Sequence, residues 1–197
     1  MTTNDWYEIV GPAVPLTQGD LILRCPILRW KALSAEELQA VADPQRLQQA
    51  TQLFAADVVV MTQACDMEHG KVPNVVLCPH MSITTFRQGW EKSILAMSQN
   101  PTAKAWRATC NDIADGYVWN QAFLNCIRVG DGEFESDLRI VDFHEVLTVP
   151  RGFLDLLVQQ RATARPRLLP PYREHLSQAF ARFFMRVGLP TPIEKTW

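Results

Sequence analysis

The sequence predicts an α+β domain: a small antiparallel sheet with inserted helices and a C-terminal amphipathic helix. Two short valine-rich runs, at residues 57–64 and 74–80, have the length and β-branched content of buried strands. From Ser82 the apolar residues change to helical spacing, and a second helical stripe runs from Leu176 to Val187. A chain of 197 residues that is 47% hydrophobic and 20% charged is long enough to bury its own core.

The N-terminal half is expected to alternate strands with short helices. Residues 21–30 favour a strand, and Pro26 within them indicates a bulge, an edge or a strand end. Ser34 and Glu37 have capping-box spacing, which predicts a helix from about residue 35. Pro44 begins a second helical stretch over residues 44–54. The two valine-rich strands follow, and we expect them to pair antiparallel around a loop at 65–73.

The C-terminal half begins with two expected helices, one from Ser82 to the Asn100-Pro101 stop and one over residues 102–114. Residues 117–129 and 137–149 have strand patterns and flank a glycine-rich turn, which predicts a hairpin. Pro150 opens a further helix. Residues 161–171, rich in Pro and Arg, predict a linker. We therefore expect one domain over residues 1–160 and a tail, 161–197, whose helix packs on it.

Composition excludes several classes of protein. No apolar run reaches the roughly 18 residues that a membrane-spanning helix needs, and the N-terminus has no basic signal-peptide region. We therefore expect a cytoplasmic protein without membrane contact, whose five cysteines are reduced thiols. The P-loop, dinucleotide-binding, zincin and nucleophile-elbow signatures are missing, and we expect no cofactor. The oligomeric state is not fixed by these features.

Five residues of types that bind zinc lie between positions 65 and 80: Cys65, Asp66, His69, Cys78 and His80. In an antiparallel pair Cys65 lies at the turn end, whereas Cys78 and His80 lie at the far end, beside residues 58–60. At about 3.3 Å per residue the two groups are roughly 13–20 Å apart. One tetrahedral zinc ion cannot bind both groups, so we expect no metal site.

A smaller group of residues in the same stretch is compatible with several roles. Cys65, Asp66 and His69 lie together at a strand end and loop, where functional groups concentrate. His69 could promote ionisation of a nucleophilic Cys65 thiol, which Asp66 would oppose. The alternatives are a polar ligand pocket and a structural turn capped by Asp66. Together with Thr62 and Gln63, these three residues form the candidate binding site.

Two scattered patterns also allow a structural or a functional interpretation. The carboxylates Asp20, Asp57, Asp66 and Asp142 could meet at strand ends and bind a divalent cation, or they could lie apart on the surface. Asp142 and His144 alternate along a predicted strand, which is compatible with a catalytic dyad or with a structural hydrogen bond.

The tail carries the opposite charge to the body. Residues 1–150 hold 11 basic and 18 acidic side chains, a net charge of −7, whereas residues 151–197 hold 8 and 3, a net charge of +5. Arginine favours bidentate contact with phosphate or carboxylate, so the tail binds an anionic partner or docks on its own acidic body. We take Arg167 and Arg173 as candidate contacts to nucleic acid or to a protein partner. The tail arginines are Arg161, Arg165, Arg167, Arg173, Arg182 and Arg186.

Three segments, GDLI at 19–22, DVVVMTQ at 57–63 and NVVLCPHMS at 74–82, resemble the core of the bacterial MazF/PemK family of SH3-like barrel toxins. The resemblance covers about residues 17–85 and implies an SH3-like barrel or bent sheet with RNA endonuclease activity. The family places an active arginine just before the valine run, where residues 55–57 here are Ala-Ala-Asp. A Ser/Thr position after the second strand maps onto Ser82 or Thr84.

Residues 58–66 are also similar to a V-V-x-[ST]-Q-x-C-D signature of uncharacterised bacterial proteins, which favours Gln63, Cys65 and Asp66 as a unit. We predict a non-enzymatic binding or interaction protein that uses the 63–69 loop and the Arg-rich C-terminal region. The first alternative is a MazF/PemK-like RNA endonuclease or its inactive relative. The second alternative is a thiol- or metal-dependent enzyme centred on Cys65.

Overall fold

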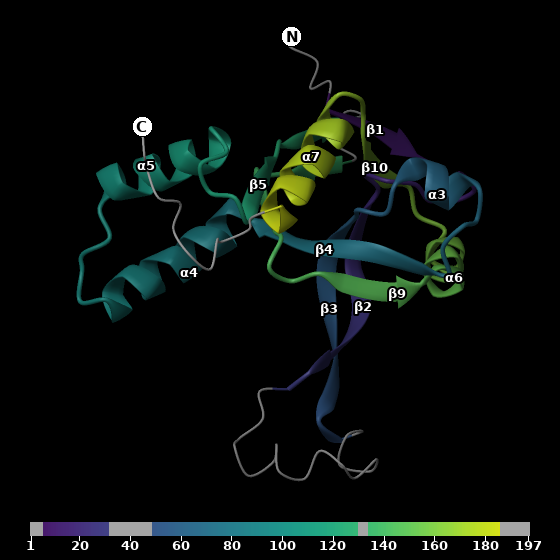
Figure 1. Cartoon of the computed structure of the whole chain (residues 1–197), viewed down its shortest axis with the longest axis horizontal. Coiled ribbons are helices and arrows are strands. Elements are labelled where there is room, and N and C mark those ends of the chain that lie inside the picture. Colours follow the sequence, from purple (N-terminus) through teal and green to yellow (C-terminus); the bar gives the residue numbers. More distant parts are fainter. Residues whose placement is uncertain (1–5, 32–48, 130–133, 186–197) are drawn as a thin grey trace, which may run out of the picture. The chain divides into compact units, whose positions relative to one another are not determined.

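The computed structural model describes residues 6–31, 49–129 and 134–185, and the chain divides into two compact units (Figure 1). One unit, here the sheet unit, comprises residues 7–80 and 146–168. The other, the helical unit, comprises residues 1–6, 81–145 and 169–197. The predicted α+β class is confirmed: helices and antiparallel strands are mixed, and the sheets are open rather than closed into a barrel.

Four strands form the main sheet of the sheet unit: β2 (Leu21–Trp30), β3 (Thr51–Val60), β4 (Asn74–Ser82) and β9 (Leu147–Pro150). β3 pairs antiparallel with β2 and with β4, and β4 pairs antiparallel with β9. Val58 lies opposite Pro79 and Val60 opposite Leu77, so the expected pairing of the two valine-rich strands is confirmed. Their β-branched side chains suit a buried sheet, because Val58, Val60 and Leu77 are fully inaccessible.

A second, two-stranded sheet in this unit joins the two ends of its chain. β1 (Tyr7–Val10) pairs antiparallel with β10 (Arg165–Leu168). The predicted linker at 161–171 is therefore wrong for these four residues, which form a strand because they have a distant pairing partner. Pro166 is tolerated there because a two-stranded sheet leaves one edge of each strand without a ladder. α6 (Arg151–Arg161) precedes β10 and starts directly after Pro150, as expected.

The core of the sheet unit is formed by the strands together with two helices. α3 (Ala64–Glu68) contributes Met67, and α6 contributes Leu154 and Val158. The predicted 65–73 loop therefore begins with a short helix that is anchored in the core. The buried cluster consists of Leu16, Ile22, Cys25, Ile27, Val58, Val60, Met67, Val75, Leu77, Val149, Leu154 and Val158.

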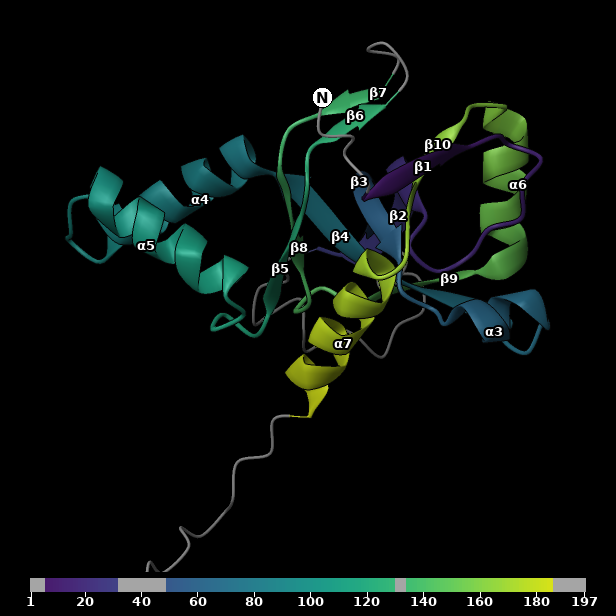
Figure 2. The same cartoon turned by 90° about the horizontal axis from the view of Figure 1, so that it is seen from above.

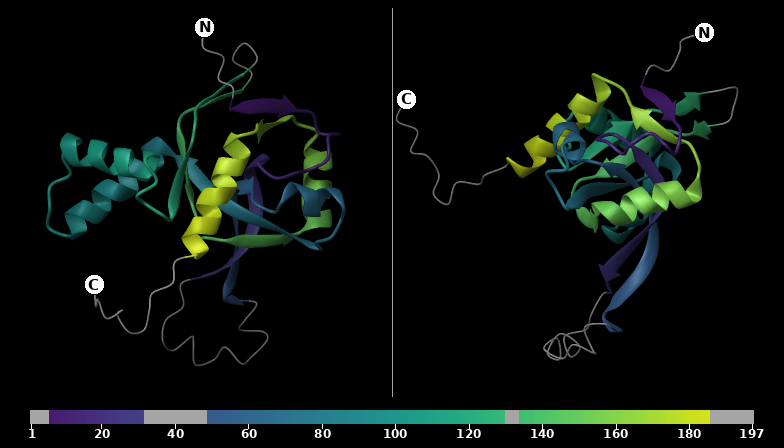
Figure 3. Two further views of the ribbon diagram at one scale, coloured as in Figure 1. Left: turned by 45° about the horizontal axis from the view of Figure 1, so that its top comes forward. Right: turned by 90° about the vertical axis from the view of Figure 1, so that its right-hand side faces the viewer.

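β2 and β3 continue beyond the other strands of the sheet unit as a two-stranded arm, formed by residues 25–30 and 51–56 (Figure 3). The predicted helix over 44–54 is wrong for residues 51–54, because they pair with residues 27–30 of β2. The expected irregularity near Pro26 lies just before it, as a register shift between Ile22 and Cys25. Arg24 within this shift has a left-handed φ of 48°.

Among its described residues, the helical unit contains one interrupted hairpin and three helices. β5 (Gln121–Leu124) pairs with β8 (Arg139–Asp142), and β6 (Ile127–Val129) pairs with β7 (Phe134–Ser136), so the predicted hairpin is confirmed. Each of its two long strands is, however, broken into shorter ones, and β9, which was expected as part of the second, pairs with β4 instead. The helices are α4 (Ile83–Ala96), α5 (Ala103–Ala114) and α7 (Tyr172–Phe184).

α4 and α5 lie side by side and contact each other through aromatic rings (Figure 2). Ser82 and Thr102 cap their N-termini, each accepting a hydrogen bond from a backbone amide three residues on. The Trp106 ring packs on Phe86 and Trp90, with ring centroids 6.0 and 5.2 Å away. All three helices were predicted within a few residues of their observed bounds.

Two predicted features lie wholly or mainly outside the described residues. These are the helical stretch that starts near residue 35 and the glycine-rich turn at 130–133. Within the ranges that the structure does describe, no helix has both the length and the apolar character needed to cross a membrane.

Candidate functional site

Thr62 and Gln63 connect β3 to α3, and β4 holds them in place. The Thr62 hydroxyl is buried and accepts a hydrogen bond from the Val76 amide at 2.7 Å. The Met61 amide donates to the Val76 carbonyl at 2.8 Å, and the Gln63 carbonyl accepts from the Met67 amide at 3.1 Å. Thr62 therefore fixes the start of α3 from within the protein, whereas Gln63 is exposed beside it.

The solvent side of α3 is polar and rests on a buried anchor. Met67 is 1% exposed and belongs to the core. Gln63, Cys65, Glu68 and His69 are all exposed, and the last three have the i, i+3, i+4 spacing of one helix side. We call these four residues the α3 face. The structure thus brings most of the candidate loop residues together on one helical surface.

The Cys65 side chain contacts oxygen atoms of its sequence neighbours. Its Sγ lies 3.8 Å from Gln63 Oε1 and 3.9 Å from Asp66 Oδ1. The same Asp66 oxygen forms an ion pair with Lys71, whose Nζ lies 3.8 Å away. His69 ends α3, where its backbone amide donates to the Cys65 carbonyl at 3.2 Å. The thiol thus donates to two oxygen acceptors, a role that suits a contact surface.

The two halves of the zinc-ligand set remain apart. Cys78 lies opposite Val59 in the middle of the β3–β4 pair and is fully buried, whereas Cys65 is exposed on α3 beyond the end of β3. His80 is also buried, at 4% exposure. Among the described residues, no three His, Cys, Asp or Glu side chains are grouped so that they could hold a metal ion.

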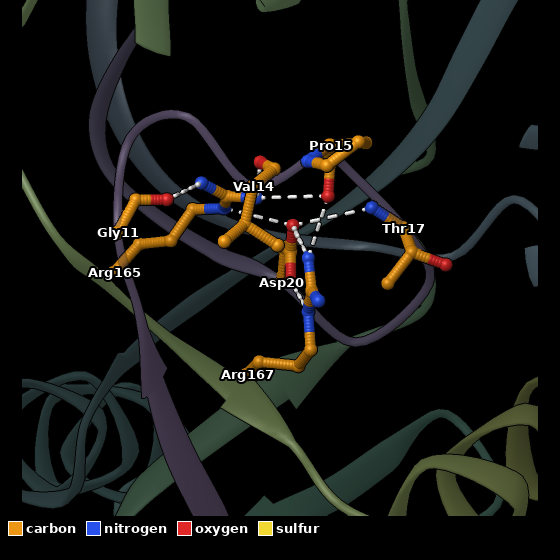
Figure 4. Close-up of polar contacts among 7 residues, drawn as sticks. All are labelled: Gly11, Val14, Pro15, Thr17, Asp20, Arg165 and Arg167. Carbon is orange, nitrogen blue, oxygen red and sulfur yellow. Dashed lines mark hydrogen bonds and ion pairs between the residues drawn. The ribbon is translucent and has the colours of Figure 1, made fainter.

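Arg167, predicted as a binding residue, belongs to a buried charge cluster with Asp20 and Arg165 (Figure 4). Asp20 is fully buried, and its carboxylate accepts from Arg165 Nε at 2.8 Å and from Arg167 Nη2 at 3.0 Å, as well as from Arg167 Nε. The Thr17 amide donates to the same carboxylate at 3.2 Å. The two arginines alternate along β10, so both point to one side of the strand.

The remaining guanidinium donors hold the loop between β1 and β2. Arg165 donates to the carbonyls of Gly11, Val14 and Pro15, at 3.3, 2.7 and 3.1 Å. Arg167 Nη2 also donates to the Pro15 carbonyl at 2.7 Å. Loop carbonyls that would otherwise lack partners are thereby satisfied, as buried backbone acceptors require.

Electrostatics reinforce this arrangement at Arg167. Burial works to lower the pKa of its guanidinium, but the hydrogen bond and the charge of Asp20, together with the charge of Glu8, outweigh burial and raise it. Arg167 therefore stays charged at any working pH. The sequence offered two interpretations of the basic tail, and at Arg165 and Arg167 the partner is a carboxylate of the same chain.

Other tail arginines also donate within the chain. Arg173 Nη2 lies 2.6 Å from Glu174 Oε1, a hydrogen bond that lowers the pKa of Glu174. Arg161 donates to the carbonyls of Leu23 and Arg24, both at 2.6 Å. Arg182 donates weakly to a backbone carbonyl at 3.5 Å, and its guanidinium carbon lies 5.4 Å from the centroid of an indole ring, that of Trp119. Arg186 lies outside the described residues.

In the helical unit, Asp142 and His144 are in contact, as their alternation along the sequence allowed. His144 Nδ1 lies 3.3 Å from Asp142 Oδ1 and 3.0 Å from Asn120 Nδ2. The His144 amide also donates to Asp142 Oδ1 at 2.9 Å, and its ring meets the Phe183 ring edge-on at 5.1 Å. These bonds close a turn after β8, which is the structural interpretation of the pair.

The four scattered carboxylates each have a partner of their own. Asp20 binds the two arginines of β10, Asp57 Oδ1 accepts from the Arg24 amide at 2.8 Å, and Asp66 pairs with Lys71. Asp142 binds the His144 backbone. The carboxylates therefore stabilise turns, a bulge and a strand pair.

The positions aligned with MazF/PemK also have local structural roles. Ser82 Oγ caps α4 by accepting from the Thr85 amide at 3.1 Å, and Thr84 is exposed in the first turn of that helix. Residues 55–57, where the family has its arginine, lie within β3.

No protein-family model and no curated protein matches this sequence. The function therefore has to be inferred from the residues themselves. The sequence missed the role of Asp20 as a buried anchor, although one signal was present: two arginines two positions apart beside a proline in an otherwise linker-like segment.

Proposed function

We propose that this chain is a non-enzymatic cytoplasmic binding protein of bacteria that engages a protein partner through the α3 face. The observation that supports this most directly is the construction of that face. Four exposed polar side chains are presented on a helix whose opposite side is fixed by Met67 and whose start is fixed by Thr62. A surface held in place from below loses little conformational freedom when a partner binds, which favours affinity.

Two further observations favour binding over catalysis. The Cys65 thiol donates to an amide oxygen and to a carboxylate oxygen, which is a hydrogen-bonding role suited to a contact surface. Arg165 and Arg167, which could have contacted phosphate, donate to Asp20 and to loop carbonyls. We therefore give Arg167 a structural role and limit the proposed contact surface to the α3 face.

The partner that suits this surface is a polypeptide with mixed polar character. Glu68 offers acceptors, the His69 ring offers a donor, and the Gln63 amide offers both. Interfaces of this polarity rely on matched hydrogen bonds and on a few well-placed contacts rather than on apolar area.

Site-specific photo-crosslinking tests the proposal. Cys65 is the one exposed thiol among the described cysteines, so a maleimide photo-crosslinker attached to the folded chain reports on the α3 face. In extract of the source cells we expect one predominant protein adduct. The matched control carries the same label in a Cys65→Ser, Leu95→Cys variant, which places it on an exposed α4 position and should not give that adduct.

Binding of the captured protein to variants of the chain then measures how much each residue of the α3 face contributes to affinity. We expect Gln63→Ala and His69→Ala to weaken its affinity about tenfold each, as for central contacts of an interface, while Arg173→Ala leaves it unchanged. Equal capture from position 95, or affinity unaffected by both substitutions, would contradict the proposal. Cleavage of labelled RNA by the purified chain, abolished by Thr84→Ala, would instead favour the MazF/PemK-like endonuclease.

A further inference from the structure

The β2–β3 arm has an apolar stripe on one of its two faces. Leu28 lies directly opposite Leu53, and Trp30 follows two residues after Leu28 on the same face. These three side chains are 67%, 73% and 60% exposed, respectively. Large apolar side chains grouped in this way on a protruding element mark an interaction surface. The other face of the arm packs on the core through Cys25 and Ile27, which are 0% and 3% exposed, so the stripe is the face left for a partner.

The outer edge of β3 along the arm is open to a further strand. β4 pairs with β3 at residues 58–60, and at residues 52–56 β3 has β2 on one side and no strand of the described chain on the other. The edge sequence, Gln-Leu-Phe-Ala-Ala, contains no Pro, Lys or Arg, which are the residues that usually block edge pairing. β2, by contrast, carries Pro26, a register shift and Arg29.

We infer that this edge pairs with the same edge of a second copy of the chain, antiparallel and about a two-fold axis at Phe54. Antiparallel pairing of identical strands is what a two-fold axis generates. In this register Leu53 lies opposite Ala55 of the second copy, Gln52 opposite Ala56, and Phe54 opposite its own copy. No charged residue in this stretch meets a like charge, so the edge is complementary to itself.

Pairing of the β3 edges gives a larger interface than stacking the two apolar stripes would. Three side chains per copy would bury only about half of the roughly 800 Å² per partner that stable interfaces bury. Pairing along β3 adds backbone hydrogen bonds and merges the two stripes into one larger apolar face. On the other face it brings two Phe54 rings together, each already covered by Arg29, whose guanidinium carbon lies 4.3 Å from the ring centroid. This dimer does not depend on the proposed function of the α3 face.

Sedimentation velocity of the full chain between about 1 and 100 µM tests the inference. We expect a monomer–dimer equilibrium in which Leu53→Lys raises the dissociation constant about tenfold or more, because it places a charge at the paired edge. The control, Leu95→Lys on α4, should leave the constant unchanged. Far-ultraviolet circular dichroism verifies that each variant is folded. A monomer throughout this range, or a dimer indifferent to Leu53→Lys, would overturn the inference.

Disulfide trapping tests the register independently. In a Cys65→Ser background, Phe54→Cys should give a covalent dimer under mild oxidation, because position 54 meets its own copy at about 5 Å between Cα atoms. Gln52→Cys is the matched control, since four residues of offset separate its copies by about 13 Å. Equal cross-linking of the two variants, or none from Phe54→Cys, would contradict pairing centred on Phe54.

Discussion

Asp20 is a fully buried carboxylate that accepts hydrogen bonds from two arginines and one backbone amide. Removing a charge from water is costly, and the cost is offset only where partners satisfy the charge closely. Here the partners also bind three loop carbonyls, so one carboxylate organises the β1–β2 loop and β10 together. Two guanidinium groups share this one carboxylate, so the cluster depends on the Asp20 side chain.

Asp20→Asn should lower the free energy of unfolding by about 3–5 kcal/mol, because it removes the buried carboxylate charge that two arginines share. Urea denaturation followed by circular dichroism measures the change. Asp66→Asn is the control, since it removes only an exposed pair with Lys71 and should cost no more than about 1 kcal/mol. Equal losses in the two variants would show that the buried cluster adds no stability of its own.

Cys25 links stability to alkaline pH. Its burial raises the pKa of the thiol to about 11, although Arg161 acts in the opposite direction, whereas an unfolded chain titrates near the ordinary value of 9.0. The folded state therefore keeps its proton longer, so this contribution is complete below about pH 9 and is lost as pH rises toward about 11. We expect the free energy of unfolding to fall across this interval, and to fall less steeply in Cys25→Ala. Parallel pH profiles for the two proteins would exclude this role.

At the scale of elements, hydrophobic periodicity predicted the helices and strands that are determined by local sequence. α4, α5 and α7 follow from their apolar spacing, and the paired valine-rich strands follow from two short apolar runs. The errors have non-local causes. Residues 51–54 form a strand because β2 lies beside them, and residues 165–168 do so because β1 pairs with them and Asp20 binds their arginines.

The candidate site was predictable in part for the same reason. Gln63, Cys65 and His69 are neighbours in sequence, so their proximity needed no knowledge of the fold. The structural roles of Thr62 and Arg167 depend on β4 and on Asp20, which are distant in sequence. The arm also escaped prediction, because part of β3 has a sequence that fits a helix as well as a strand.

The start of α4 provides a test at this scale. Ser82→Ala should lower the free energy of unfolding by about 1 kcal/mol, because the first turn loses its side-chain cap. Ser93 lies within the same helix, where its hydroxyl donates to the Gly89 carbonyl, so Ser93→Ala should change stability by less than about 0.5 kcal/mol. Thermal denaturation distinguishes the two, and equal effects would contradict capping.

For the whole molecule, both units are assembled from separate parts of the chain. The sheet unit needs residues 146–168 as much as residues 7–80, because β9, α6 and β10 supply its sheets and core. The boundary expected from the sequence, near residue 160, separates β10 from the carboxylate that it binds.

A chain ending at residue 160 should therefore be unfolded, or destabilised by several kcal/mol, since Asp20 would be buried without a partner. A chain ending at residue 185 keeps every described contact and should retain the fold. Circular dichroism and dispersion of amide proton resonances compare the two. Native-like spectra from the shorter chain would mean that β10 is dispensable.

The β1–β10 pair has a consequence for biosynthesis. The first strand of the sheet unit leaves the ribosome long before the last, and at about 5–20 residues per second the interval between residues 7 and 165 is roughly 10–30 s. During that time the buried aspartate lacks its arginines and the valine-rich strands lack their final cover. Nascent chains of this protein should therefore depend on chaperones until β10 has left the ribosome.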